Sequence, residues 1–213
     1  MTFEIAATVP GPHARARIVT AGRPATEAGS ALVLLHGRGA SAEDILGLAS
    51  ELAARDIAYV APQAAGGTWY PYSFLAPIPQ NEPYLGSALR KVAAVIGALP
   101  VERERIVLLG FSQGACLTLE FAARNAGRYA AIAAFTGGLI GPPGTPRSYA
   151  GSFEGTPIFI GSSDVDPHVP LERVHESTAV LTRMGAEVDE RIYPGMAHTV
   201  NQDEIHAVDA LLG

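Results

Sequence analysis

The stretch Ile106-Val107-Leu108-Leu109-Gly110-Phe111-Ser112-Gln113-Gly114-Ala115 decides the fold of this 213-residue chain. Its first four residues are all apolar, which predicts a strand covered on both faces, as in a parallel sheet. A helix pattern begins directly after Ser112 and runs to Asn125. Between the two, the G-x-S-x-G spacing predicts a sharp turn with a strained serine, because side chains at the flanking glycine positions would collide with the neighbouring strand and helix.

The same alternation of short apolar runs and helix-length segments continues along the chain. It predicts an α/β fold, with a mainly parallel central sheet and helices on both faces. A further run at Ala14–Thr20 predicts an antiparallel strand at the sheet edge, and Ser41 with Asp44 predicts a capped helix start. The other expected strands are Ala31–Leu35, Ile57–Ala61, Ile106–Leu109, Ala130–Phe135, Pro157–Ile160 and Val188–Tyr193, and the expected helices are Ala42–Arg55, Leu85–Leu99, Gln113–Asn125, Leu171–Met184 and Gln202–Leu212.

Length and composition indicate one globular domain over residues 1–213. Hydrophobic residues make up 48% of the chain and charged residues 17%, which excludes a disordered chain. The net charge of −6 argues against nucleic-acid binding, which needs a basic surface. The histidines and carboxylates show no metal-ligand spacing, so we expect neither a metal nor a cofactor.

Several features of the sequence predict a cytoplasmic protein. Residues 1–12 carry Glu4 and no basic residue, which is unlike a secretory signal. The most apolar region, Ile106–Gly141, is interrupted by charged and polar residues, so we expect no membrane span and no stable membrane association. A single cysteine, Cys116, excludes an internal disulfide and suits a reducing compartment. We expect it to act as a small buried hydrophobic residue behind the turn.

Ser112 is the candidate nucleophile, and it needs partners. A serine hydroxyl is a weak nucleophile at neutral pH unless a base takes its proton and an acid orients that base. After a G-x-S-x-G turn, the acid and then the histidine follow in chain order. His198 is the candidate base, because its loop follows the last expected strand, where parallel sheets place ligands. His175 and His206 lie in helical patterns with polar neighbours and are expected at the surface.

The acid has two candidates, Asp164 and Asp166. Both follow the strand expected at Pro157–Ile160, so their place in the chain does not separate them. The other aspartate is expected to cap the loop by accepting hydrogen bonds from backbone N–H groups. Glu172 is less suitable because it begins the next expected helix.

Four ordered motifs together resemble the phospholipase/carboxylesterase family, which includes acyl-protein thioesterases and bacterial carboxylesterases. They are Leu35-His36-Gly37-Arg38-Gly39, Gly110-Phe111-Ser112-Gln113-Gly114-Ala115, Asp166-Pro167-His168-Val169-Pro170 and Gly195-Met196-Ala197-His198. The resemblance covers nearly the whole chain and implies an α/β-hydrolase fold without a large cap domain. It also implies Asp166 as the acid, since the family's aspartate directly precedes the proline of its D-P-x-V-P segment.

An oxyanion hole requires two backbone N–H groups that point at the developing negative charge. Gln113 supplies one, as the residue after the nucleophile, and the other comes from the loop after Ala31–Leu35. The resemblance implies Arg38 for the second, a departure because the family often has an apolar residue there. Its side chain either contacts an anionic group of the substrate or faces solvent. His36 is expected to tie down this loop.

The connection Gln63–Pro83 is rich in aromatic residues, which argues against disorder. A loop of this length in a compact domain is usually functional. We expect it to form the wall or lid of an acyl pocket; the alternative is that its rings only cover the edge of the core. By resemblance, residues 68–72 lie near the acyl site, but they differ from the loop expected of thioesterases that act on lipidated proteins. The candidate substrate-binding residues are Trp69, Tyr70, Tyr72 and Phe74.

These expectations describe a serine carboxylesterase that cleaves small soluble acyl esters through a Ser112–His198–Asp166 triad and an acyl-enzyme. With no amphipathic membrane helix in the sequence, small esters are favoured over lipidated proteins and bilayer phospholipids. Acyl thioesters, lysophospholipids and amides are alternative substrates for the same residues. A non-catalytic binding protein on the same fold is the alternative from another class. The sequence leaves open homodimerisation through an exposed edge or the aromatic loop.

Overall fold

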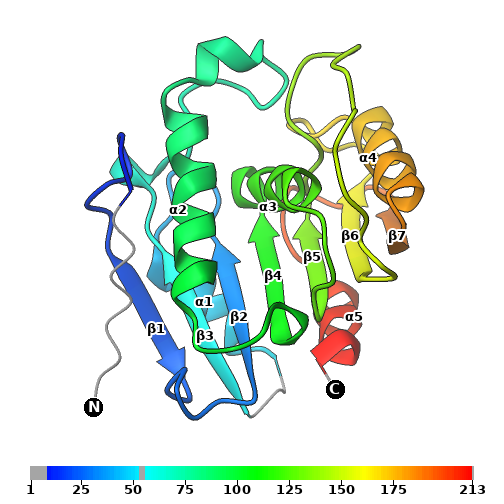
Figure 1. The fold of residues 1–213 in the computed structure, drawn as a ribbon. Helices are drawn as coiled ribbons and strands as arrows, with labels where there is room; N and C mark the ends of the chain where they lie inside the picture. Colours follow the sequence, from blue (N-terminus) through cyan, green and yellow to red (C-terminus); the bar gives the residue numbers. More distant parts are fainter. Residues whose placement is uncertain (1–8, 53–55, 213) are drawn as a thin grey trace.

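The computed structural model describes residues 9–52 and 56–212, which form a seven-stranded sheet between two layers of helices (Figure 1). The strand order is β1-β3-β2-β4-β5-β6-β7, and every neighbouring pair is parallel except β1 with β3. The strands are β1 (Ile18–Gly22), β2 (Ser30–Leu35), β3 (Ile57–Pro62), β4 (Ile106–Phe111), β5 (Ala131–Phe135), β6 (Pro157–Ser163) and β7 (Glu187–Tyr193).

Helices cover both faces of this sheet. The side chains of α2, α3 and α4 join one buried cluster, and those of α1 and α5 join the other. Three short 3₁₀ turns lie in the connections, at Ala65–Gly67, Ile78–Asn81 and Arg103–Arg105. The helices are α1 (Ala42–Ala49), α2 (Tyr84–Ala98), α3 (Gln113–Arg124), α4 (Leu171–Arg183) and α5 (Gln202–Leu212). None of these helices is long and apolar enough to cross a bilayer.

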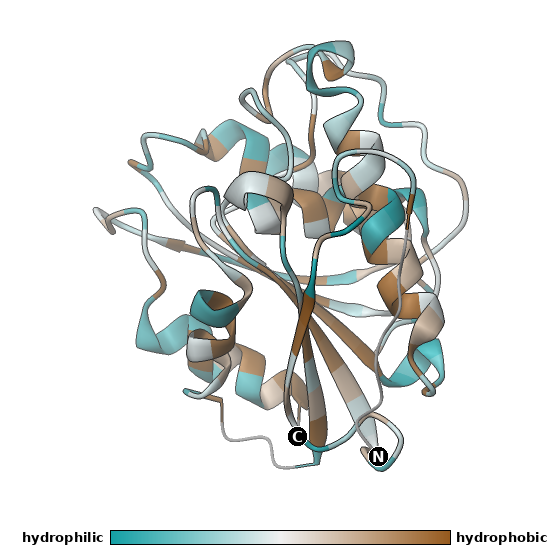
Figure 2. Cartoon of the chain, turned by 90° about the vertical axis from the view of Figure 1, so that its left-hand side faces the viewer, coloured by the Kyte–Doolittle hydropathy of each residue, from teal (hydrophilic) through white to brown (hydrophobic). Residues whose placement is uncertain are grey.

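Alternation of side chains along the strands divides the core into its two halves. In β2, Val33 and Leu35 pack under α2, α3 and α4, whereas Leu32 and Leu34 pack under α1 and α5. All four are at most 2% exposed, as expected of a strand buried on both faces. Figure 2 shows the apolar strands gathered between the helices. The expected α/β architecture is confirmed, and no connection among the described residues forms a separate cap domain.

Two expected boundaries differ from the structure by four residues or more. The edge strand β1 is antiparallel as expected, but it begins at Ile18 rather than Ala14, because the preceding residues form turns with the bonds Ala14 N–H to Gly11 O and Ala16 N–H to His13 O. Helix α1 ends at Ala49 rather than Arg55; the last three residues of that expected helix lie outside the described residues.

Local hydrogen bonds explain where α1 begins and ends. Ser50 donates from both its backbone N–H and its hydroxyl to the carbonyl of Gly47, which closes the last turn. At the other end, Ser41 caps the helix as expected, and together with Asp44 it forms a capping box.

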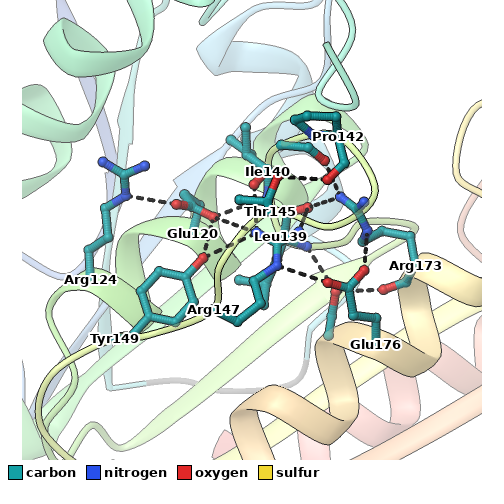
Figure 3. Close-up of polar contacts among 12 residues, drawn as sticks. Glu120, Arg124, Leu139, Ile140, Pro142, Thr145, Arg147, Tyr149, Arg173 and Glu176 are labelled. Carbon is teal, nitrogen blue, oxygen red and sulfur yellow. Dashed lines mark hydrogen bonds and ion pairs between the residues drawn. The ribbon is translucent and has the colours of Figure 1, made fainter. Parts of the chain in front are cut away.

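A buried network of charged side chains fastens the long connection between β5 and β6 to α3 (Figure 3). Glu120 on α3 is 1% exposed, and its carboxylate pairs with Arg124 at 2.7 Å. It also accepts hydrogen bonds from the Tyr149 hydroxyl and from the backbone N–H of Ile140, each at 3.0 Å. One carboxylate therefore holds both ends of residues 140–149.

Two arginines complete this network on the side of α4. Arg147 donates to the carbonyl of Ile140 at 2.6 Å and to Glu176 on α4 at 3.0 Å. Arg173 on α4 donates to the carbonyls of Leu139 at 2.7 Å and Gly141 at 2.6 Å. The connection is thus held between two helices by charge-assisted hydrogen bonds, in which every arginine faces a carboxylate.

Replacing Glu120 by alanine should lower the free energy of unfolding by about 1–3 kcal/mol, because it leaves the buried backbone N–H of Ile140 and the Tyr149 hydroxyl without their acceptor. Urea denaturation monitored by circular dichroism measures the loss. Glu43→Ala is the matched control, since Glu43 pairs with Arg17 at the surface, where solvent screens the pair and its removal should have little effect on stability. Equal losses in the two variants would contradict the role of the network.

Glu204 is a buried carboxyl in the first turn of α5. Its side chain accepts a hydrogen bond from the backbone N–H of Asn201 at 2.8 Å, and its own N–H donates to the Asn201 side chain at 3.0 Å. The other carboxyl oxygen has no partner among the described residues. Burial raises the pKa of Glu204 to about 7, so the fold favours its neutral form.

Glu204→Gln should therefore stabilise the protein at high pH. Because the pKa is higher in the folded state, the wild type loses stability as the pH rises from about 4.5 to about 7, and the loss amounts to about 3 kcal/mol. The variant stays neutral and avoids this loss. Urea denaturation at pH 8 should give a higher free energy of unfolding for the variant than for the wild type. At pH 4 this difference should largely disappear. A difference of the same size at both pH values would contradict the burial of a carboxyl with a raised pKa.

Candidate active site

Ser112 lies in the turn between β4 and α3 with a strained backbone, at φ 54° and ψ −117°. A Cβ on Gly110 would lie 2.4 Å from the carbonyl of Gly114, and one on Gly114 would lie 2.0 Å from the carbonyl oxygen of Leu35. Only glycine fits at either position. The backbone N–H of Ser112 donates to Phe135 O at 2.9 Å, which ties the turn to the end of β5.

Three loops at the carboxyl edge of the sheet bring Ser112, His198 and Asp166 together. Nε2 of His198 lies 2.8 Å from the hydroxyl oxygen of Ser112, and Nδ1 lies 2.7 Å from Oδ2 of Asp166. The three residues follow β4, β7 and β6 respectively. The side chain of His198 is 20% exposed and that of Asp166 is fully buried, so the chain of hydrogen bonds runs from the protein interior to an accessible serine.

Asp166 is held in its charged form. Burial by itself opposes the charge, but the hydrogen bond from His198 and those from the backbone N–H groups of His168 and Val169 outweigh it and lower the pKa of Asp166. The two backbone bonds, at 2.8 and 2.9 Å, end on Oδ1 and leave Oδ2 for the imidazole. A carboxylate fixed in this way selects the tautomer in which Nδ1 carries the proton.

Asp164, the second aspartate of this loop, does not contact the imidazole of His198. Oδ1 of Asp164 accepts a hydrogen bond at 2.7 Å from the backbone N–H of Gly195, three residues before His198. It therefore caps the histidine loop. The structure brings Asp166 and not Asp164 to the imidazole, a choice that chain position alone left open.

The remaining histidines downstream of Ser112 lie outside this chain of hydrogen bonds. His175 pairs with Glu190 at the surface, and His206 contacts Gln202 on the exposed side of α5. The ring of His168, in contrast, stands edge-on to that of His198, with 4.8 Å between the ring centroids. No residue pattern predicts a role for His168, and its position two residues after Asp166 is the one signal in the sequence that indicates it.

The two candidate oxyanion donors follow neighbouring strands of the sheet. Arg38 follows β2 and Gln113 begins α3 after β4, and these strands are paired with Leu35 opposite Gly110. Within residues 9–52 and 56–212, neither backbone N–H has a hydrogen-bond acceptor. Two unpaired N–H groups beside Ser112 are available to a substrate oxygen.

A pocket of about 470 Å³ opens in front of Ser112. Tyr70, Tyr72 and Phe74 line it, whereas Trp69 does not. The expectation that Trp69 belongs to the substrate-binding side chains is wrong, because its ring is fully buried and its Nε1–H donates to the carbonyl of His36 at 2.9 Å. Tyr72 is 56% exposed, so the pocket opens to solvent on that side.

The pocket wall that contains Phe74 contacts the connection that is fastened by the buried network of Figure 3. The carbonyl of Phe74 accepts a hydrogen bond at 2.7 Å from Gly141, which lies in the connection that the network fastens. The guanidinium of Arg173 also lies over the Phe74 ring, 5.9 Å from its centroid. The pocket wall is therefore attached to α4 as well as to its own loop.

His36 and Cys116 have structural surroundings. Nδ1 of His36 lies 2.7 Å from the carbonyl oxygen of Gly37, and Nε2 accepts a hydrogen bond from the backbone N–H of Ala64 at 3.0 Å. Burial lowers the pKa of His36, which keeps it neutral. Burial also raises the pKa of the Cys116 thiol to about 12, so it stays protonated beneath the pocket. No group of three or more metal-ligating side chains occurs among the described residues.

A serine, a histidine and a carboxylate joined at the carboxyl edge of a mainly parallel sheet, with the serine in a G-x-S-x-G turn, define the α/β-hydrolase fold. The sequence model of the phospholipase/carboxylesterase family matches residues 13–212. The chain belongs to this family.

Individual proteins that are similar to this chain support its membership of the family. The crystal structure of a phospholipase/carboxylesterase from Dyadobacter fermentans DSM 18053 superposes with a TM-score of 0.89 at 48% identity, over 92% of this chain and 96% of that one. NocK of Nocardia uniformis subsp. tsuyamanensis is 30% identical over 78% of this chain and 48% of its own length. Acyl-protein thioesterase 1 of Gibberella zeae is 30% identical over 51% of this chain and 47% of its own length. The chain thus spans about half the length of the curated relatives it matches.

Proposed function

We propose that this chain is a serine carboxylesterase that hydrolyses small soluble acyl esters through an acyl-enzyme on Ser112. The observation that carries the proposal is the pair of hydrogen bonds at His198, 2.8 Å to Ser112 and 2.7 Å to Asp166. These distances give the imidazole a proton to accept and a carboxylate to orient it, which is what an activated serine requires.

The first half of the reaction forms the acyl-enzyme. Nε2 of His198 takes the hydroxyl proton as Oγ of Ser112 attacks the carbonyl carbon of the ester. Asp166 stabilises the imidazolium without taking its proton. The backbone N–H groups of Arg38 and Gln113 donate to the oxyanion, and each such donor is worth about 3 kcal/mol of barrier. The imidazolium then protonates the leaving alcohol, and the C–O bond breaks.

The second half repeats the same steps with water. Nε2 of His198 deprotonates a water molecule, which attacks the acyl carbon, and the tetrahedral intermediate collapses with return of the proton to Ser112 Oγ. The acid product leaves and the serine is regenerated. These steps use only side chains and backbone groups of this chain, acting as one domain.

The pocket supports small esters as substrates. Its volume of about 470 Å³ lies in the lower part of the range for small-molecule sites. Its walls include the rings of Tyr70 and Phe74, and no carboxylate stands among the side chains that line it. We place the chain in the cytoplasm, where the single cysteine, buried as a thiol, suits a reducing compartment.

Ser112→Ala should reduce ester hydrolysis to near the background rate, and Asp166→Asn should lower kcat by about 10³–10⁴-fold, since the amide no longer selects the productive imidazole tautomer. Initial rates on p-nitrophenyl butyrate measure both effects. In parallel, a fluorophosphonate probe should label Ser112 of the wild type and neither Ser112→Ala nor His198→Ala. A folded wild-type protein without labelling or turnover would favour the binding-protein alternative.

Thioester hydrolysis is the second candidate activity, favoured by the similarity to acyl-protein thioesterase 1 of Gibberella zeae. A matched panel of butyryl substrates, as the oxygen ester, the thioester and the amide of comparable leaving groups, distinguishes the two activities. We expect the highest kcat/KM on the oxygen ester. A kcat/KM that is tenfold higher on the thioester, after correction for the uncatalysed rates, would replace carboxylesterase by thioesterase.

A further inference from the structure

The side chain of Arg38 is exposed, and among the described residues it pairs with no carboxylate. It donates to three consecutive carbonyls of the aromatic loop, to Tyr70 at 3.0 Å, to Pro71 at 2.9 Å and to Tyr72 at 2.7 Å. A planar guanidinium suits this task because its N–H groups point in fixed directions. The residue that supplies one oxyanion N–H thus holds the pocket wall with its side chain.

The side chain of Gln113, the other candidate oxyanion residue, also forms hydrogen bonds to the aromatic loop. Its side-chain oxygen accepts hydrogen bonds from the backbone N–H of Trp69 at 2.9 Å and from the Thr68 hydroxyl at 3.2 Å. Its side-chain nitrogen donates to the carbonyl of Tyr70 at 2.8 Å. Tyr70 O is therefore shared between the two side chains. Only 6% of Gln113 is exposed.

Further contacts hold the chain before and after Arg38. Nε1 of Trp69 donates to the carbonyl of His36 at 2.9 Å, and the two rings pack with 5.0 Å between their centroids. On the other side, the backbone N–H of Gly39 donates to the carbonyl of Gly67 at 2.8 Å. Residues 67–72, which we term the brace segment, thus contact the chain before and after the Arg38 N–H as well as its side chain.

An oxyanion donor contributes most when its direction is fixed before the reaction, so that no reorganisation is needed as charge develops. The loop after β2 is short and rich in glycine, with Gly37 and Gly39 on either side of Arg38. Such a backbone is intrinsically permissive, so its orientation must be imposed by contacts. Here the brace segment supplies part of those contacts. The Gly37 carbonyl, in the same peptide as the Arg38 N–H, also lies 2.7 Å from Nδ1 of His36 and accepts a hydrogen bond from the backbone N–H of Ala40 at 3.3 Å.

We propose that the side chains of Arg38 and Gln113 are positioning residues: they fasten the brace segment across the oxyanion hole and so fix the directions of their own backbone N–H groups. The acyl-pocket wall and the oxyanion hole then behave as one rigid unit. This inference rests on the proposed serine-esterase function. It assigns to the Arg38 side chain a role different from contact with an anionic substrate group.

Trp69 provides a direct optical report on the brace segment, because it is the only tryptophan of the chain and is fully buried. Arg38→Met removes three hydrogen bonds, and Thr68→Val removes a hydroxyl donor without changing a side chain that lines the pocket. Arg128→Met is the control, since Arg128 also donates to a backbone carbonyl but lies before β5, at the other end of the sheet. Acrylamide quenching of Trp69 fluorescence should increase in both brace variants and stay at the wild-type value in the control.

Activity measurements test whether a loosened brace segment impairs the oxyanion hole. In Arg38→Met, kcat on p-nitrophenyl butyrate should fall by about 10- to 100-fold with KM changed by less than about threefold. Affinity for a butyl trifluoromethyl ketone, whose serine adduct carries an oxyanion, should fall by the same factor as kcat. Thr68→Val should show the same pattern with a smaller amplitude. Arg38→Lys should restore little, because a lysine ammonium lacks the planar fork.

Three outcomes would overturn the proposal. In the first, Trp69 stays shielded in Arg38→Met. In the second, Trp69 becomes accessible while kcat and ketone affinity stay at wild-type values. The brace segment would then have no effect on the oxyanion hole. In the third, activity falls only on a p-nitrophenyl hemisuccinate ester and not on the butyrate, which would make Arg38 a contact for anionic substrates. A wild type without ester turnover would instead refute the proposed function, and the quenching data would still show whether the side chains fasten the segment.

Discussion

The contact between Gly114 at the start of α3 and the carbonyl oxygen of Leu35 at the end of β2 is the constraint on which the site depends. A Cβ at this position would lie 2.0 Å from that oxygen, so the helix approaches the strand only because the residue is glycine. This approach sets the sharp turn that holds Ser112 at φ 54°. It also brings the backbone N–H of Gln113 beside the loop that carries Arg38, since β2 and β4 are neighbours in the sheet.

The aromatic loop, residues 63–83, is attached to the rest of the molecule near its start and at its middle, and it is also bonded within itself. Arg38 and Gln113 hold its first part, and the hydrogen bond from Gly141 to Phe74 holds its later part. Asn81, which is fully buried, fixes the tip between them through bonds to the backbone of Tyr72 and Ser73. A wall held at three points keeps its shape when a substrate enters, which limits the entropy lost on binding.

Charge is distributed around the site so that only Asp166 is ionised next to the imidazole. Hydrogen bonds lower the pKa of that carboxyl, while burial keeps His36 neutral and Cys116 protonated. In the proposed reaction, the imidazole of His198 is the base that is oriented to receive the proton of Ser112. The buried charges of Glu120, Arg147 and Arg173 lie behind the pocket wall and pair among themselves and with Glu176.

The sequence by itself determined the parallel sheet, the strand–turn–helix around Ser112 and the loop that carries His198, because hydrophobic periodicity and glycine spacing are local properties of the chain. It left three matters to the tertiary structure. Asp164 and Asp166 stand two residues apart, and only the packing of β7 beside β6 brings one of them to an imidazole 32 residues further along the chain. Trp69 turns inward and Arg38 reaches the carbonyls of Tyr70 to Tyr72 because their partners come from segments more than 30 residues away. Such partners depend on how strands are ordered in space, which a local pattern of residues does not encode.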